Sequence, residues 1–259
     1  MFSDECMNPL SWETRNLGIE CFGLKESFIE NPDGELLKQC LHDKRSLVEK
    51  FFVQARVAKQ HVITSKLLEK QGFYFVEAVL CPFTVISKNK AFENFLADKS
   101  AFLPKRFRIE EIGILTLSNP DGQVLGDIMS IANESFTDDR FHVDPYCAPE
   151  IANGRYSYWA DDLAQDETVK FNLLTYQQKT IAFMARRSDN LLLAGFSQKH
   201  IGSGMGDFFW LSVLENMLGE GLHSASTLIS VHNIPVLNLY ARIGFKFKNP
   251  SATFHYWSE

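Results

Sequence analysis

The sequence predicts an α/β (α+β) fold, because stretches with a strand pattern alternate with stretches that suit helices. Apolar and polar residues alternate at 170–176 and 180–186, which predicts two strands joined by a short Gln-Gln-Lys turn. An apolar strand at 191–196 enters a glycine-rich turn that is followed by a helix-compatible segment. The C-terminal run 229–247 contains a strand, a short helix and a second strand.

Upstream of these elements, the pattern predicts a strand at 107–112 and helices at 122–136 and 148–163. A polar and aromatic loop, TDDRFHVDPYCAPE, separates the two helices. The stretch 87–106 mixes Lys, Asn, Ser and Pro, and we expect it to be a linker. The chain is therefore divided into an N-terminal αβ domain at 1–86, this linker, and a larger domain at 107–259.

The two domains contain similar segments. LLEKQGFYF at 67–75 lines up with LYARIGFKF at 239–247, and in each a helix end precedes Gly-Phe and a strand. A partial, diverged duplication explains this similarity, and so does chance, since such connections are frequent. In the first segment Leu68 occupies the place of Tyr240, so only the second segment carries a hydroxyl.

Composition narrows the class of protein. The chain has 259 residues, 45% hydrophobic, which is enough for one large domain or two small ones. The net charge is −6 with no basic stripe, so nucleic acid is not an expected partner. The acidic N-terminus lacks an apolar leader and no run could span a membrane, so we expect a cytoplasmic protein without membrane insertion. Five cysteines without a C-x-x-C pair indicate neither a disulfide framework nor a zinc site.

The turn after the strand at 191–196 suits an anion such as a pyrophosphate. Backbone amides at a helix N-terminus bind anions, and glycines let the backbone come close. A dinucleotide fingerprint would need glycine at Asp207, and the Gly-Lys-Ser/Thr of an ATP-binding loop is absent. A flexible connection without a ligand is the structural alternative. The candidate binding residues of the turn are Lys199, His200, Ile201, Gly202, Ser203 and Gly204.

The short C-terminal helix carries two further candidates. Asn233 and Tyr240 are seven residues apart, so they share one face about 10 Å apart along the axis, and one long ligand could touch both. Pro235 fits the first turn and Gly244 fits the end of this helix. The alternative is that Asn233 only caps the helix and Tyr240 only packs in the core.

This order of strand, Asn, helix, Tyr and Gly-Phe resembles the C-terminal signature of the GCN5-related N-acetyltransferase superfamily. The resemblance implies a mixed, mainly antiparallel twisted sheet flanked by helices, with a partial copy of that fold at 1–86. It implies acetyl-CoA as cosubstrate, contacted by Asn233, with Tyr240 protonating the departing thiolate. Backbone amides among Ala194, Gly195 and Phe196 would stabilise the oxyanion. The turn departs from the superfamily pattern at His200, where a glycine is expected.

Four segments narrow the resemblance: PLSWETRNLGI, GFYFVEAVLCPF, ESFTDDRFHVDPYCAP and GRYSYWADDL. Together they look like the bacterial TDP-fucosamine acetyltransferase family, which acylates the amine of a dTDP-linked 4-amino-4,6-dideoxy sugar. Glu77 then matches the family's base, and the alternative is a Glu that faces water at a strand edge. For the nucleotide sugar, Arg140 and Arg155 would pair with phosphate, while Phe141 and Tyr146 would stack on thymine or cover the sugar.

Other interpretations stay open. The two arginines could be solvated surface charges. A metal cluster of Asp138, Asp139, His142 and Asp144 is rejected, because no regular spacing brings these side chains together and the chemistry needs no metal. Acetylation of peptides or small amines is the second function, and a non-catalytic acyl-CoA-binding module is the third. An exposed edge strand at the C-terminal FHYW suggests a possible homodimer.

Overall fold

The structure, a computed structural model, describes residues 3–58, 61–135 and 139–258. Its strands form one sheet in the order β1-β2-β3-β11-β4-β9-β8-β7-β6-β5, and β10 pairs with β4 beside this path. The strands are β1 (Met7–Pro9), β2 (Glu20–Leu24), β3 (Phe51–Ala58), β4 (Tyr74–Val85), β5 (Ile112–Ser118), β6 (Val169–Tyr176), β7 (Lys179–Arg187), β8 (Asn190–Phe196), β9 (Ser224–Ser226), β10 (Ile229–Ser230) and β11 (Lys246–Trp257).

Helices flank this sheet on both faces. They are α1 (Ser3–Cys6), α2 (Ser11–Leu17), α3 (Glu26–Glu30), α4 (Gly34–Leu47), α5 (Val62–Lys70), α6 (Lys90–Ala97), α7 (Gly122–Ser135), α8 (Pro149–Gln165), α9 (Gly206–Gly219) and α10 (Ile234–Arg242). Among the described strands, β2 with β3 and β8 with β9 are the parallel pairs, and the other pairs are antiparallel. The predicted mixed, mainly antiparallel sheet with flanking helices is confirmed.

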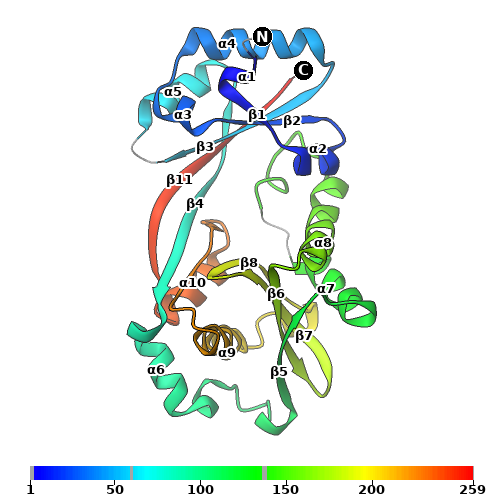
Figure 1. Cartoon of the computed structure of the whole chain (residues 1–259), viewed down its shortest axis with the longest axis vertical. Helices are drawn as coiled ribbons and strands as arrows, with labels where there is room; N and C mark the ends of the chain where they lie inside the picture. Colours follow the sequence, from blue (N-terminus) through cyan, green and yellow to red (C-terminus); the bar gives the residue numbers. More distant parts are fainter. Residues whose placement is uncertain (1–2, 59–60, 136–138, 259) are drawn as a thin grey trace.

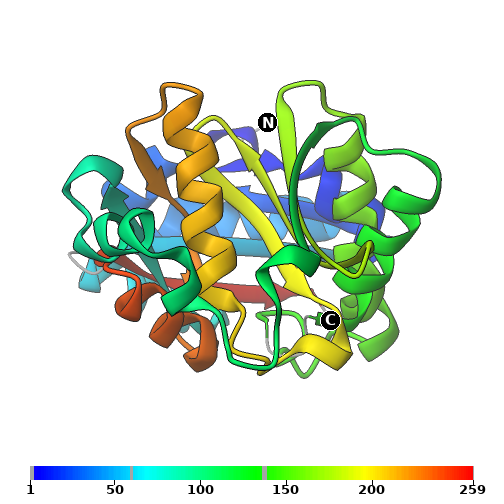
Figure 2. The same ribbon diagram turned by 90° about the horizontal axis from the view of Figure 1, so that it is seen from below.

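Two groups of elements lie at the ends of an elongated molecule, and β4 and β11 run between them (Figure 1). At one end, α4 and its neighbours cover a core that includes Phe51, Leu68 and Tyr256. At the other end, α9 packs on one face of β7 and β8 with α6 beside it, while α7 and α8 pack on the opposite face (Figure 2). This arrangement follows from the period of two along each strand, because residues of β7 contribute alternately to the two cores.

Strand β11 lies between β3 and β4, pairing with β3 from Ser251 to Trp257 and with β4 from Lys246 to His255. The C-terminal strand is therefore an interior strand, and the expectation of an exposed edge at FHYW is wrong. This removes the sequence argument for a homodimer through that strand. The sequence could not show it, because the partners of β11 come from the first third of the chain.

The stretch expected to be a linker, 87–106, contains α6, which begins after the N-cap Asn89 and buries Phe92 and Phe95. The strand expected at 107–112 is also displaced, since β5 begins at Ile112 and the preceding residues form a short turn of helix. The alternation of apolar residues continues from Ile112 to Leu117, which explains why the strand lies later in the chain than predicted. The predicted helices at 122–136 and 148–163 correspond to α7 and α8.

Phe136, the predicted end of the first helix, and Asp138, a member of the rejected metal cluster, lie outside the described residues. Within the described ranges, no helix is long and apolar enough to cross a membrane.

Candidate active site

Strands β8 and β9 diverge from each other. Along one side β8 pairs with β7 up to Phe196, but in the described chain its ladder with β9 consists of one position, Asn190 opposite Ser226. The backbone of Ala194, Gly195 and Phe196 therefore borders an opening in the sheet. A Cβ atom at Gly195 would lie 2.7 Å from Ser135 Oγ, so glycine is needed here for α7 to pack against the strand.

The turn beyond β8 presents a helix N-terminus. Gly202 and Gly204 have φ angles of +70° and +84°, which glycine adopts without strain. Helix α9 begins at Gly206, and its N-cap Met205 gives no side-chain hydrogen bond to the first turn. Because the first N–H groups of a helix have no partner within it, this end of α9 is available to an anion.

The corresponding place in the N-terminal part is closed. Strands β2 and β3 stay paired from Glu20 opposite Phe51 to Gly23 opposite Gln54. Two helices lie between these strands: α3, a five-residue helix without a side-chain cap, and the longer α4. The side chain of Asp33 caps α4 by accepting hydrogen bonds from the backbone of Glu35 and Leu36. Among the described residues, the parallel pair of the N-terminal part is therefore not opened, and the longer of the two helices between its strands is capped. In the C-terminal part, by contrast, an opened parallel pair is followed by a long helix without a side-chain cap.

Cationic side chains surround the turn. Arg106 donates from Nη2 to the carbonyl of Ser203 at 2.8 Å. His200 Nδ1 lies 2.8 Å from Ser197 Oγ, and burial, followed by the charges of Arg106 and Lys199, lowers the pKa of His200. Sequence reasoning missed Arg106, because it lies in the stretch interpreted as a linker. The Pro-Lys-Arg at the end of that stretch was its only sequence signal.

Asn233 lies at the N-terminus of α10, as predicted. Its side-chain oxygen accepts a hydrogen bond from the backbone of Val236 at 3.3 Å, and Pro235 lies in the first turn. Asn233 therefore caps the helix, which confirms this part of the structural alternative. The residue is partly exposed, so a ligand at the helix entrance can reach it.

Tyr240 lies seven residues, about two helical turns, beyond Asn233 and is buried, with 4% of its surface exposed. Its ring packs against Trp210 of α9 and against Phe245, at centroid distances of 6.2 and 4.8 Å. Burial raises the pKa of Tyr240 to about 12. A phenol with this pKa keeps its proton at neutral pH, so it suits a proton donor and not a base.

Glu77 lies near the same end of the opening. Strand β10 pairs with Val79 and Leu80 of β4, and Val231 donates to the carbonyl of Ala78, the neighbour of Glu77. Two residues later the chain enters the N-cap of α10. Glu77 is 5% exposed, so it does not face water as the alternative interpretation required.

A β-bulge sets the direction of Glu77. The register between β4 and β11 shifts by one residue between Thr253 and Phe254. Glu77 is opposite Thr253, whose Oγ1 lies 3.5 Å from Glu77 Oε1, and Tyr74 is opposite His255. Because opposed residues share a face, Glu77 and Tyr74 lie on one face of the sheet, although they are three positions apart along β4.

On this face, Asp144 accepts four hydrogen bonds and anchors its loop. The donors are His255 Nδ1 and Tyr74 Oη at 2.6 Å each, Trp257 Nε1 at 2.9 Å and the Tyr146 amide at 3.0 Å. Burial alone would raise the pKa of Asp144, but these hydrogen bonds, that of His255 first, lower it. The group is therefore a buried carboxylate.

His255 is fully buried, and burial lowers its pKa despite the hydrogen bond from its ring to Asp144. The imidazole is therefore neutral and carries its proton on Nδ1, facing the carboxylate. Sequence reasoning missed this pair, because 111 residues separate Asp144 from His255 and no spacing connects them.

The predicted phosphate ligands Arg140 and Arg155 meet at Glu13 of α2. Arg155 donates from Nε and Nη2 to the two carboxylate oxygens, at 3.1 and 2.6 Å, and Arg140 donates from Nη2 at 2.7 Å. Burial would raise the pKa of Glu13, but the charge of Arg155 and then that of Arg140 lower it. Both guanidinium groups thus hold α2 against α8 and its preceding loop.

Phe141 and Tyr146 differ in accessibility. Phe141 is fully buried, between Phe52 and His255, so its ring is a core contact in this conformation. Tyr146 is 67% exposed, 5.6 Å from the ring of Tyr74, and can cover a ligand. It also borders a cavity of about 350 Å³ whose other lining residues include Lys50 and Trp257.

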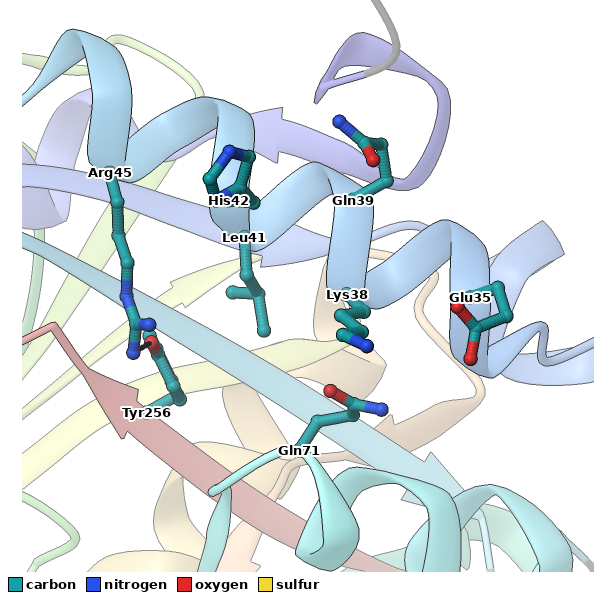
Figure 3. Close-up of a pocket in the computed structure, with 8 residues that line it drawn as sticks. All are labelled: Glu35, Lys38, Gln39, Leu41, His42, Arg45, Gln71 and Tyr256. Atoms are coloured by element: carbon teal, nitrogen blue, oxygen red, sulfur yellow. Dashed lines mark hydrogen bonds between the residues drawn. The ribbon is translucent and has the colours of Figure 1, made fainter.

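A second cavity, of about 320 Å³, lies over α4 and contains Lys38, His42 and Arg45 (Figure 3). Tyr256 lines it from β11 and points to the face opposite His255, because neighbours along a strand alternate. None of the predicted site residues lines this cavity, so we place the candidate site elsewhere. Among the described residues, no three His, Cys, Asp or Glu side chains are grouped to hold a metal ion.

Comparison with known proteins agrees with this fold. No family model matches the chain. The spore coat polysaccharide biosynthesis protein SpsD of Bacillus subtilis (strain 168) is 21% identical over 258 residues, covering 95% of this chain and 81% of that protein.

Solved structures are similar over nearly the whole chain. A GCN5-related N-acetyltransferase from Sphaerobacter thermophilus has a TM-score of 0.62 at 12% identity, covering 97% of this chain and 76% of that one. A tandem GNAT protein from the clavulanic acid biosynthesis pathway has a TM-score of 0.60 at 10% identity, covering 93% and 76%. At these identities the likeness establishes the fold, which is that of the GCN5-related N-acetyltransferases.

Proposed function

We propose that this chain is an acetyl-CoA-dependent N-acetyltransferase of the cytoplasm, with its catalytic part at 107–259 and a partial copy of the fold at 1–86. One observation carries the proposal: the opening between β8 and β9 coincides with the N-terminus of the long helix α9, which has no side-chain cap, whereas β2 and β3 stay paired in the N-terminal part. The similar structure from the clavulanic acid pathway is named a tandem GNAT protein, which supports two copies of the fold in this chain.

In this proposal the opening holds the pantetheine arm of acetyl-CoA. The pyrophosphate binds the turn from Ile201 to Gly204 through the amides of Gly202 and Gly204, and it binds the first turn of α9, with Lys199, His200 and Arg106 nearby. The amides of Ile201 and Ser203 donate to carbonyls within the turn and hold its shape. Asn233 contacts the arm from the entrance of α10. A backbone amide among residues 194–196 donates to the oxyanion that forms on the thioester carbonyl.

Glu77 removes a proton from the acceptor ammonium, directly or through water. The free nitrogen attacks the thioester carbon, the C–N bond forms, and the C–S bond breaks as the tetrahedral intermediate collapses. Tyr240 gives its phenolic proton to the CoA thiolate and regains one from solvent. The pKa of about 12 keeps this donor protonated until the thiolate forms.

For the acceptor we propose the amine of a dTDP-linked amino-dideoxy sugar. The four segments that suggested this class from sequence supply Trp12, Glu77, Arg155 and the loop around Asp144, and the relative SpsD is named for polysaccharide biosynthesis. Arg140 is the phosphate ligand of this proposal through its terminal nitrogens, and Arg155 positions it through Glu13. The exposed Tyr146 covers the nucleotide, while the buried Phe141 packs against His255.

The test is thiol release from acetyl-CoA in the presence of dTDP-amino sugars, peptides and free amines. We expect rapid release with an amino sugar, and a Glu77→Gln defect that shrinks as pH rises and the free amine becomes more abundant. If the enzyme prefers peptides or simple amines as acceptors, its function is the second one, acetylation of peptides or small amines. Acetyl-CoA binding without transfer to any amine would favour a non-catalytic acyl-CoA-binding module.

A further inference from the structure

Three buried polar atoms on the face of Glu77 lack a hydrogen-bonding partner in the described part of the chain. They are Gln54 Oε1, His255 Nε2 and Arg140 Nε. Gln54 of β3 is directly opposite His255 of β11, so their side chains share one face. The Arg140 guanidinium lies 4.9 Å from the ring of Phe141, which is 5.3 Å from the His255 ring.

Such atoms are costly, because a buried donor or acceptor without a partner loses its hydration and gains nothing in return. Gln54 Oε1 accepts hydrogen bonds. His255 Nε2 also accepts, because its partner Asp144 fixes the proton on Nδ1. Arg140 Nε donates. The complementary ligand must therefore offer two donors and at least one acceptor within a small space.

We propose that Gln54, His255 and Arg140 form a subsite that binds two neighbouring hydroxyl groups of the acceptor's sugar ring. Two hydroxyl protons satisfy Gln54 and His255, and a hydroxyl oxygen accepts from Arg140. This proposal rests on the proposed function and adds the feature of the substrate that is recognised. A sugar that carries its amine at position 4 and is deoxygenated at position 6 keeps such a pair at positions 2 and 3.

The place of the subsite fits a single ring. His255 is two residues from Thr253, the residue opposite Glu77, which corresponds to roughly 7 Å along the strand. An amine held at Glu77 can thus belong to the ring whose hydroxyl groups reach His255. The segment from Asp139 to Cys147 packs against His255 through Phe141 and Asp144. Acceptor binding must therefore move the Phe141 ring, while Asp144 keeps its hydrogen bond to Nδ1.

A peptide or a simple alkylamine lacks this pair of hydroxyl groups and leaves the three atoms unsatisfied. A site built to hydrogen-bond a substrate hydroxyl rejects the analogue without it, because its buried polar groups remain unpaired. The subsite therefore gives selectivity for a sugar over other amines.

The test variant is His255→Asn. Its amide can still donate to Asp144 from the position of Nδ1, but it lacks an atom at Nε2. The control is His42→Asn, an exposed histidine of α4 outside the site. Kinetics are measured with a dTDP-4-amino-4,6-dideoxyhexose and with its 3-deoxy analogue, so that each enzyme is compared on acceptors with and without the pair.

We expect His255→Asn to lower kcat/KM for the full acceptor by about tenfold to hundredfold, and to leave kcat/KM for the 3-deoxy analogue nearly unchanged. Acetyl-CoA affinity should not change, and His42→Asn should match the wild type on both acceptors. Equal losses on both acceptors, or no loss on either, would overturn the subsite.

A binding measurement separates this inference from the proposed function. In the wild-type protein, the ¹⁵N resonance of His255 Nε2 is followed by NMR while dTDP-glucose, which has hydroxyl groups but no amine, or dTDP alone is added. A shift with dTDP-glucose and not with dTDP supports the subsite even if no acetyl transfer is found. The absence of a shift with either ligand overturns it even if transfer is found.

Discussion

Leu68 and Tyr240 occupy equivalent positions at the ends of two helices. The carbonyl of Leu68 accepts a hydrogen bond from the backbone of Phe73 at 3.1 Å, and that of Tyr240 accepts one from Phe245 at 2.9 Å. The glycine before each Phe has a φ of +89° or +85°. The strands that follow, β4 and β11, pair with each other. The same local structure thus carries a hydrocarbon in one part and a phenol in the other.

Tyr240→Phe should lower kcat and leave acetyl-CoA affinity nearly intact, because the ring still packs against Trp210 and Phe245. Loss of a general acid costs on the order of 10² to 10⁴ in rate. Single-turnover kinetics measure transfer, and isothermal titration measures binding. A variant with wild-type kcat, under conditions where acyl transfer limits the rate, would make Tyr240 a packing residue only.

Leu68→Ala should change stability and not chemistry. Leu68 is fully buried, and truncating such a leucine costs about 2 to 5 kcal/mol. Urea unfolding gives the free energy of unfolding, and turnover is divided by the folded fraction. A protein that keeps its stability but loses turnover would show that the N-terminal part takes part in the reaction.

Gly202→Val should weaken acetyl-CoA binding by straining the turn before α9, where φ is +70°. Gly221→Val is a matched control, since Gly221 has a φ of +82° and also has no atom near an added Cβ, but lies beyond the other end of α9. Cofactor dissociation constants of the two folded variants are compared. If both variants bind acetyl-CoA equally well, the turn is not the pyrophosphate site.

Local patterns predicted the strands and helices well where one segment determines its own structure. The alternation of apolar and polar residues predicted β6 and β7. Pro235 and Gly244 predicted the two ends of α10 close to its observed bounds. The helix within 87–106 was not predicted from the sequence. Its polar residues lie on the outer side, and other segments bury its Phe92 and Phe95. Composition cannot distinguish such a helix from a linker.

The same distinction applies to the candidate site, where residues of one continuous segment could be predicted and contacts between distant segments could not. The turn at Gly202 and the pair Asn233 and Tyr240 come from continuous segments, so their spacing could be interpreted. The contacts of Asp144 with His255 and of Glu13 with Arg155 join residues more than a hundred positions apart, and only the assembled sheet brings them together. The face of the sheet on which the Glu77 side chain lies depends on a β-bulge, and the residue pattern does not predict that bulge.

Glu13→Gln should destabilise the protein by about 3 to 5 kcal/mol, because it leaves the buried Arg155 and its neighbour Arg140 without a counter-charge. Arg15→Gln is the control, since Arg15 also joins α2 to α8, through Asp162, but is exposed, and its loss should change stability much less. Urea unfolding checks both. Equal effects would mean that α2 is held by its packing and not by the charge on Glu13.

The last prediction concerns acid. The pKa of His255 is lowered by burial below its ordinary value of 6.5, so the unfolded chain binds a proton at this residue more readily than the folded one. The stabilising effect is complete above pH 6.5 and is lost as pH falls from there towards the folded pKa. Asp144, Glu77, Arg140 and the neutral Tyr74 lie near the ring, and the negative charges of Asp144 and Glu77 do not outweigh burial. In His255→Asn the dependence of the unfolding free energy on pH should be weaker between pH 6.5 and 5, as measured by urea unfolding at each pH. If the two proteins lose stability in parallel over this range, His255 is protonated in the folded state and cannot accept a hydrogen bond through Nε2.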